Sequence, residues 1–593
     1  MKLLKIVKLL VITVLPVVLL LPALVPNLKQ DSAGPARVSY NPPPADIYHA
    51  PLSDMGLLGL TLAAYHTNLS AVVDPSVAAP TTNSNNPQNG PQTINQNTIR
   101  FINDNSYFPQ SETSIAVDLG NPSHVVGGFN DPKFFFCISL PSDCDSPSPP
   151  VSLSGFTVSI DGGLSVLKGG SLPNLNVSAS FFPFVPFGDP VVAPSPDGGF
   201  FYGSLGLSAF GGNGVMIAKS NPNLFDPNVS CATTFFSPTT NPCWTIVFVS
   251  GSPSLSLTIE DKPVIAVDQS NSPYRGFVYI AWTHFDFFLF KSSSYLARCD
   301  GDLNSCVMLA GGTLDPVSGP DRFADFSTPV VDGTGNVYVT WCNIGTVRTF
   351  GPIACKVRSS LPGGAAFSGT TTIVSFMGPG TMLPDASYTR GFATEQFRTA
   401  SIPWLAVDAS SKATSGNLYF TIPVCSSGRY IAPRDPFFGG DNPGNCGLSS
   451  ILFSRSIDGG LTWSTPVALS RPAVNTQPYI TVDPVSGHLF VVYYTTQYDS
   501  FNHRIDVVAQ ESIDGGSTFH QFKVTRVSNE PDADPNMFFY LGDFGGSWTT
   551  PQYGDYFQAT AIDGTLWVLF TANYSVEHGT FQTDPFLAVL IRP

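Results

Sequence analysis

The sequence predicts an all-β protein, a seven-bladed β-propeller of four-stranded antiparallel blades, and two observations lead to this prediction. A short apolar strand that ends in a small or acidic turn residue recurs seven times along the chain. Each copy is followed, after a turn that contains glycine or asparagine, by a second strand rich in β-branched and aromatic residues. Glycine and proline number 53 each and only 12% of residues are charged, which favours a turn-rich β protein over a helical one.

The first strand of each repeat sets the period. The seven copies end at Asp118, Ser195, Asp268, Asp332, Asp408, Asp483 and Asp563. The shortest step, from Asp268 to Asp332, is 64 residues, and the longest, from Asp483 to Asp563, is 80 residues. Third and fourth strands follow in most units, most clearly in residues 451–470, ILFSRSIDGGLTWSTPVALS. Four antiparallel strands per unit, repeated around a ring, make a β-propeller, and the unbroken apolar character of the first strands is typical of innermost strands buried on both faces.

The seventh unit lacks its own outer strand. After its hairpin only DPFLAVLIRP remains, which supplies three strands in place of four. We predict that residues 97–103, NTIRFIN, add the missing strand and close the ring, which removes the open sheet edges.

The chain divides into three parts. Residues 1–27 are interpreted as a signal peptide or membrane anchor, because Lys2, Lys5 and Lys8 precede a 17-residue apolar stretch that contains two prolines. Residues 28–96 are rich in Pro, Asn, Ser and Thr and are interpreted as a disordered linker. Residues 97–593 are assigned to the propeller.

Charge and cysteine content indicate an exported protein. The net charge is −15 and no basic run occurs, which excludes nucleic acid as a partner. The ten cysteines fall into five pairs whose members are close in sequence, and this spacing predicts disulfides between successive cysteines. The predicted pairs are Cys137 with Cys144, Cys231 with Cys243, Cys299 with Cys306, Cys342 with Cys355, and Cys425 with Cys446. We therefore expect a secreted or extracellular-surface protein, with a membrane contact only through the N-terminal segment.

One turn sequence resembles a known family. Residues 456–463, SIDGGLTW, match the pattern S-x-D-x-G-x-T-W, and looser copies occur in ESIDGGSTF from Glu511 and VSIDGGLSV from Val158. This pattern resembles the Asp box of the sialidase-like (BNR repeat) seven-bladed propellers secreted by bacteria, and the resemblance covers residues 97–593. We interpret Asp161, Asp458 and Asp514 as structural residues that bond the backbone of their own turns, above Trp463 or Phe519.

The strand order predicts two different faces. If the inner strands start at a top face, the Asp boxes lie at the bottom, and the loops between second and third strands lie on top, where a propeller usually binds. Three disulfides, Cys137 with Cys144, Cys342 with Cys355 and Cys425 with Cys446, are expected in these top loops. The long loop between Cys425 and Cys446 offers Arg429, Tyr430 and Arg434 as candidate ligand contacts.

Acidic residues precede the inner strands and should surround the channel at the top face. They are Glu112, Asp189, Asp261, Asp325 and Asp555. One interpretation is a site for a cation or a polyhydroxyl ligand, with Ca²⁺ as the candidate cofactor, because hard cations take several carboxylate oxygens. The other interpretation is that each carboxylate caps backbone amides where two blades meet. Both interpretations remain open from the sequence.

The resemblance also raises the question of catalysis. A sialidase would need an arginine triad, a Tyr activated by a Glu, and an Asp as acid and base. The family's early arginine motif is not met, since Arg100 lacks the proline that should follow. The candidates that remain are Glu395, Arg322, Arg398 and Arg471. The sequence therefore favours a secreted or surface-anchored propeller that binds extracellular glycans or cell-surface proteins through its top face; an exo-sialidase or other glycoside hydrolase is the alternative, and a structural role in an extracellular layer is a third interpretation.

Overall fold

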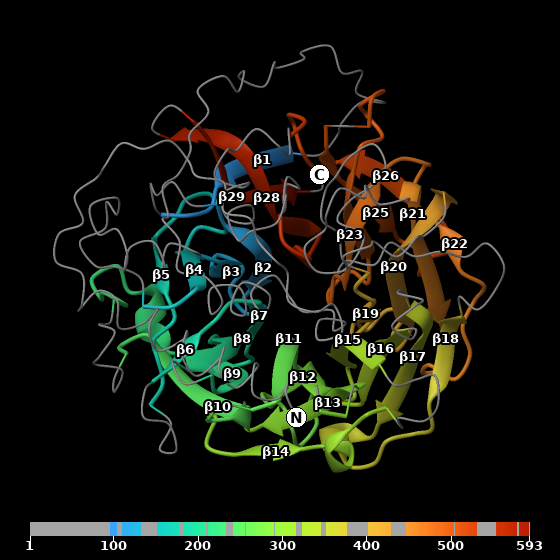
Figure 1. Ribbon diagram of the computed structural model, residues 1–593. Helices are drawn as coiled ribbons and strands as arrows, with labels where there is room; N and C mark the ends of the chain where they lie inside the picture. The colour runs from blue at the N-terminus through green and yellow to red at the C-terminus, as the bar shows by residue number, and fades with distance from the viewer. Residues whose placement is uncertain are drawn as a thin grey trace, which may run out of the picture.

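The computed structural model describes the chain from Asn95 to Ile591 with several gaps. The segments outside the description are 1–94, 104–108, 132–150, 177–182, 209–210, 233–240, 255, 287, 290, 316–322, 345–351, 376–400, 429–445, 503, 530–552, 578–579 and 592–593. The described residues form seven antiparallel sheets arranged as a wheel around a central axis (Figure 1), and the region along this axis is called the channel below. The predicted seven-bladed β-propeller is confirmed.

Blades 1 to 3 come first in the chain. Blade 1 contains β2 (Ser111–Val117), β3 (Val125–Asn130), β4 (Ser154–Ser159) and β5 (Lys168–Ser171). Blade 2 contains β6 (Phe184–Pro186) and β7 (Val191–Pro194), which both pair with β8 (Phe200–Ser208), then β9 (Asn213–Ser220) and β10 (Trp244–Ser252). Blade 3 contains β11 (Thr258–Val267), β12 (Val278–Asp286), β13 (Lys291–Cys299) and β14 (Cys306–Met308).

Blades 4 to 7 complete the wheel. Blade 4 contains β15 (Phe323–Val331), β16 (Val337–Ile344), β17 (Pro352–Ser360) and β18 (Thr371–Ser375). Blade 5 contains β19 (Trp404–Val407), β20 (Leu418–Gly428), β21 (Cys446–Ser456) and β22 (Val467–Ala468). Blade 6 contains β23 (Asn475–Val482), β24 (Leu489–Thr495), β25 (Asp506–Ser512) and β26 (His520–Lys523). Blade 7 contains β27 (Gln558–Ile562), β28 (Thr565–Glu577), β29 (Thr580–Ile591) and β1 (Asn95–Arg100).

The helices of the described residues are three short 3-10 turns, η4 (Pro222–Phe225), η5 (Ala310–Gly312) and η6 (Pro362–Gly364). None of them is long and apolar enough to cross a membrane. The first strand of each blade lies next to the channel and the fourth lies at the rim (Figure 1). We call the side where the inner strands begin the top face and the opposite side the bottom face.

Blade 7 is closed by the N-terminal strand, as predicted. All six residues of β1 pair antiparallel with β29, from Asn95 opposite Ile591 to Arg100 opposite Phe586. The Arg100 guanidinium adds an ion pair to the buried carboxylate of Asp584, with 2.6 Å between Nε and Oδ2. The strand begins two residues before the predicted 97 and ends three residues before the predicted 103.

Three of the five predicted disulfides are present. Cys231 with Cys243 lies within the connection between the third and fourth strands of blade 2, and Cys299 with Cys306 joins the third and fourth strands of blade 3. Cys342 with Cys355 was expected in a top loop, but the two residues lie directly opposite each other in the β16–β17 ladder. The expectation was wrong because these strands pair beyond the cysteines, up to Ile344 opposite Pro352.

The other two predicted disulfides are not described. Cys137 and Cys144 lie outside the described residues, as do the side chains of Cys425 and Cys446.

The Asp-box turns are bonded within themselves. In the full box, the Ser456 hydroxyl donates to the Asp458 carboxylate over 2.7 Å and accepts the Gly460 N–H over 2.9 Å. The Asp458 carboxylate also accepts the Thr462 N–H over 2.9 Å. The turns at Asp161 and Asp514 have the same pattern. These carboxylates thus accept hydrogen bonds from groups of their own turns. In Asp514, the hydrogen bonds from the Thr518 hydroxyl and N–H lower the pKa to about 2.

The closure by β1 predicts a large effect on stability. A chain that begins at Asn95 keeps β1, whereas one that begins at Ser111 exposes the edge of β29. We expect the shorter chain to melt at a clearly lower temperature and with lower cooperativity, as measured by differential scanning calorimetry. Equal melting of the two chains would contradict the role of β1.

Candidate functional site

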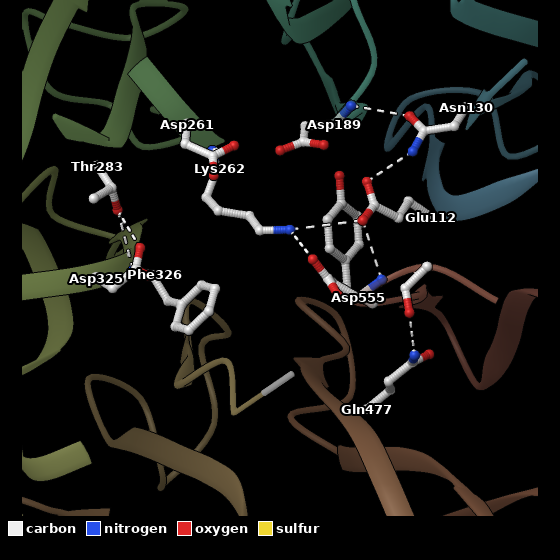
Figure 2. Close-up of polar contacts among 12 residues, drawn as sticks. Glu112, Asn130, Asp189, Asp261, Lys262, Thr283, Asp325, Phe326, Gln477 and Asp555 are labelled. Atoms are coloured by element: carbon white, nitrogen blue, oxygen red, sulfur yellow. Dashed lines mark hydrogen bonds and ion pairs between the residues drawn. The ribbon is translucent and has the colours of Figure 1, made fainter. Parts of the chain in front are cut away.

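The top end of the channel is built by one recurring backbone feature. In four inner strands the pairing register shifts at a bulge, between Ser111 and Ser114 in blade 1 and at the matching positions of blades 3, 4 and 6. A residue with positive φ occupies each bulge, and Asp189 in blade 2 has the same conformation. These residues are Glu112, Asp189, Lys262, Phe326 and Gln477, with φ between 48° and 58°. The bulges direct these side chains toward the channel (Figure 2).

A buried lysine occupies the centre of the acidic residues. Lys262 of blade 3 forms an ion pair with Asp555 of the segment leading into blade 7, and its Nζ lies 3.6 Å from Glu112 Oε1 of blade 1. The side chains are buried, at 3% exposure for Lys262 and at most 1% for the two carboxylates. The ion pair therefore links three blades across the channel (Figure 2).

The Glu112 carboxylate joins the same blades through hydrogen bonds. Its Oε2 accepts from the Asn130 side-chain amide over 2.8 Å, and its Oε1 accepts the Asp555 N–H over 3.1 Å. Asn130 in turn accepts the Asp189 N–H over 3.0 Å. Gly554 has a φ of 86°, and a Cβ at this position would collide with Glu112, so the close approach of blade 7 to blade 1 requires glycine.

The remaining acidic residues are also held by protein groups. Asp325 Oδ1 accepts from the Thr283 hydroxyl over 2.6 Å and from the Phe326 N–H over 2.8 Å. Asp261 Oδ1 accepts the Lys262 N–H over 3.0 Å. Within the described part of the chain, no group of three or more His, Cys, Asp or Glu residues is placed to hold a metal ion. These contacts favour the interpretation that the acidic residues cap blade junctions.

Protons complete the charge balance of this cluster. Burial raises the pKa of Asp189 to about 7, and burial together with Asp189 and Asp555 raises the pKa of Glu112 well above its usual range despite the nearby Lys262. Burial opposes the charge of Lys262, but Asp555 and Glu112 outweigh it and hold the lysine pKa well above its usual range. Both Asp189 oxygens are buried. The raised pKa values of Asp189 and Glu112 therefore favour a proton held within this pair of carboxyl groups.

The tyrosine beside this cluster is not activated. Tyr556 is buried next to Glu112 and donates its hydroxyl to the Pro190 carbonyl over 3.0 Å. Burial, and then the charges of Glu112 and Asp189, raise its pKa well above its usual range. A nucleophilic tyrosine would need the opposite shift, so this pair does not reproduce the Tyr and Glu of a sialidase.

The structure places the other sequence candidates as follows. Arg471 is exposed after β22, where its carbonyl accepts from the Asn475 side chain over 2.9 Å. Arg322, Glu395, Arg398, Arg429, Tyr430 and Arg434 lie outside the described residues. The cluster unites Glu112, Asp189 and Asp555, whereas Asp325 bonds to Thr283 of blade 3.

Lys262 was missed by the sequence analysis. The available signal was its position, six residues before Asp268, which matches Glu112 before Asp118 and Asp189 before Ser195.

Comparisons with known proteins give only distant similarities. No protein-family model matches the chain, and no curated protein matches it. Among solved structures, an α-L-arabinofuranosidase from Fusarium graminearum is 10% identical, with 84% of this chain and 98% of that chain covered and a TM-score of 0.39. A Trypanosoma rangeli sialidase is 10% identical, covering 70% and 57%, with a TM-score of 0.35. A polysaccharide lyase is 9% identical, covering 79% and 85%, with a TM-score of 0.40.

The protonated cluster predicts a stability that falls as pH rises. Asp189 binds its proton more tightly in the folded protein than in the unfolded chain, where its pKa is near 3.8. This contribution to the free energy of unfolding is complete below 3.8 and is lost as pH rises through about 7. We expect Asp189→Asn, which tolerates positive φ, to melt a few degrees higher than the wild type at pH 8 and equally at low pH.

The control for this prediction is an exposed carboxylate. Asp302 is 82% exposed, so Asp302→Asn should leave the pH dependence of the melting temperature unchanged. A wild-type pH dependence retained in Asp189→Asn would show that the shared proton does not contribute.

Proposed function

We propose that this protein is a secreted or surface-anchored propeller that binds extracellular glycans through its top face. The three disulfides support a location outside the cytoplasm, since such bonds persist in oxidising compartments. The acidic channel residues are engaged by blade contacts, so ligand contacts fall to the loops around them. Cell-surface proteins are the other class of partner for this face.

The observation that carries this proposal is the position of two exposed aromatic side chains. Phe288 is 69% exposed and Phe501 is 82% exposed, and they are the only aromatic residues among the large, exposed apolar side chains of the described chain. Phe288 lies between β12 and β13, and Phe501 lies between β24 and β25. Both are therefore in connections between second and third strands, on the top face.

The bottom face differs in the chemistry of its exposed apolar residues. Its turns carry aliphatic side chains, such as Ile457 at 73% and Ile513 at 67% exposure. An aromatic ring presents a flat face with partial negative charge, which attracts the C–H groups on the apolar face of a sugar ring. Exposed aromatic rings in these connections thus support glycan binding at the top face.

Glycan-array binding tests this proposal directly. We expect Phe288→Ala and Phe501→Ala each to weaken binding at least about tenfold, because each removes a stacking surface. Ile513→Ala is the matched control, since it truncates a side chain of similar exposure on the bottom face. Binding that is unaffected by both phenylalanine changes would overturn the proposal, and binding to deglycosylated cells would favour a protein partner.

Glycoside hydrolysis is a second candidate function. Glu395 stands between Arg390 and Arg398 in the sequence, shortly before the start of the inner strand β19. Glu395 is the candidate for the glutamate that activates a tyrosine nucleophile, and Arg398 is a candidate for binding the carboxylate of an acidic sugar.

Release of a fluorophore from a sialoside and from a panel of other glycosides tests this second function. If the protein is a glycosidase that depends on Glu395, the wild type turns over at least one substrate and Glu395→Gln abolishes turnover. Glu577→Gln, at the far end of β28, serves as the control for loss of a glutamate elsewhere. Turnover by neither protein would leave binding as the function.

A further inference from the structure

An amine and two carboxyl groups meet at one point at the top of the channel (Figure 2). The Lys262 ammonium contacts Oδ2 of Asp555 directly, and its Nζ lies 3.6 Å from Oε1 of Glu112. The same Oε1 accepts the Asp555 N–H over 3.1 Å, so the glutamate carboxyl lies beside both partners of the ion pair. Because Oδ2 is bonded to Cγ of Asp555, the lysine nitrogen lies next to a carbon that it could attack.

The backbone holds these groups together from opposite sides of the channel. Lys262 has a φ of 53°, which is uncommon for a residue with a side chain, and it lies in the bulge of β11. On the other side, the Gln477 side-chain amide donates to the carbonyl of Gly554, the residue before Asp555. Uncommon backbone conformations persist where the surrounding structure enforces them, and they cluster at sites with a chemical role.

The meeting point is closed to water. The side chains are 3% exposed for Lys262 and at most 1% for Glu112 and Asp555. The ring of the buried Tyr556 lies beside the ammonium, with 6.0 Å between Nζ and the ring centroid. Burying two charges costs free energy even when they are paired, whereas an amide formed from them would carry no charge. Exclusion of water also opposes hydrolysis of such an amide.

We propose that Lys262 and Asp555 condense to an amide, an isopeptide cross-link within the chain, and that Glu112 transfers the protons. The ion pair of Lys262 with Asp555 is the state that precedes the bond. The cross-link joins residues that are 293 positions apart, and it connects blade 3 to the segment that leads into blade 7. This modification goes beyond glycan binding and does not depend on it.

The bond forms without a co-reactant. Lys262 first gives a proton to Asp555, which leaves a neutral amine and a neutral carboxylic acid. The Nζ lone pair then attacks Cγ of Asp555, and Glu112 gives a proton to the departing carboxyl oxygen and takes one from the nitrogen. The bond from Cγ to that oxygen breaks, one water molecule leaves, and Glu112 has its proton again. Of the ammonium hydrogens, one remains on the amide and two leave in the water.

The protonation states of these groups suit the reaction. Burial raises the pKa of Glu112 well above its usual range, so this carboxyl holds a proton that it can give. Burial lowers the pKa of Lys262, but the charges of Asp555 and Glu112 raise it and prevail. Both negative charges are absent when the two carboxyl groups are protonated, and burial then favours the neutral amine that attacks.

Peptide mapping of the full chain, after reduction of its disulfides, tests the cross-link. We expect Lys262 and Asp555 in one branched peptide, whose mass is lower than the sum of the two linear peptides by one water molecule. Lys523 and Asp506 are the internal control, because they form an ion pair of 3.0 Å in which the lysine is 11% exposed, and they should stay unlinked. Linear, unmodified peptides for Lys262 and Asp555 from the folded wild type would overturn the proposal.

Two variants separate the amide from the ion pair. Lys262→Arg keeps a cation beside Asp555 but cannot form the amide, so it should give no branched peptide and should melt at a lower temperature than the wild type. Asp555→Asn should give a branched peptide identical in mass to that of the wild type, because ammonia leaves in place of water. A branched peptide that persists in Lys262→Arg would show that another residue forms the bond and would overturn the assignment.

The role of Glu112 needs a separate variant. Glu112→Gln should lower the cross-linked fraction at least about tenfold, because the amide side chain does not relay a proton. Melting temperatures report whether each variant folds, and the peptide map of the wild type decides the main question even where a variant does not fold. An unchanged cross-linked fraction in folded Glu112→Gln would overturn the assignment of Glu112 as the proton-transfer residue.

Discussion

Ring closure is the constraint on which the remaining structure depends. Each blade packs its apolar faces against two neighbours, so an open wheel would expose the faces at its break. Pairing of β1 with β29 prevents this by joining residues almost 500 positions apart, and the ion pair of Arg100 with Asp584 fixes the same junction. Closure also determines the two faces, because it holds all inner strands in the same direction. The top-face location of Phe288 and Phe501 follows from it.

A second closure operates inside the channel. Burying a charge costs several kcal/mol, and this cost is offset only when partners surround it closely. Lys262, Asp555 and Glu112 come from three different blades. Each blade thus contributes a charged group that neutralises a buried group of opposite charge from another blade. A proton held by Glu112 or Asp189 has the same function, because burial raises the pKa of both carboxyl groups and Lys262 is the one cation beside them in the described part of the chain. Some of the acidic residues for which a cation site was predicted thus help to hold the blades together.

The sequence predicted the wheel because the propeller repeats its signals. Seven apolar strands with similar spacing, and a seventh unit one strand short, led to the fold and to the closing strand. The contacts of the channel cluster were harder to predict from the sequence. The acidic residues were identified, but Lys262 was overlooked because only structure shows that bulges bring residues six positions before a strand end to one place. The contact of Glu260 with His284 could not be predicted either, since it depends on the pairing register of two strands.

Buried carboxylates in this propeller have two kinds of partner. Glu112 of the channel cluster pairs with groups of other blades, and Glu260 of blade 3 pairs with His284 of the same blade. Glu112 is surrounded by buried partners from several blades. Glu260 is equally buried, yet its hydrogen bond passes to His284, which is partly exposed. Each buried carboxylate therefore depends on polar partners within the fold to offset the cost of its burial. The identity of the partner, more than burial, distinguishes the carboxylates that join blades from Glu260, whose hydrogen bond reaches a partly exposed side chain.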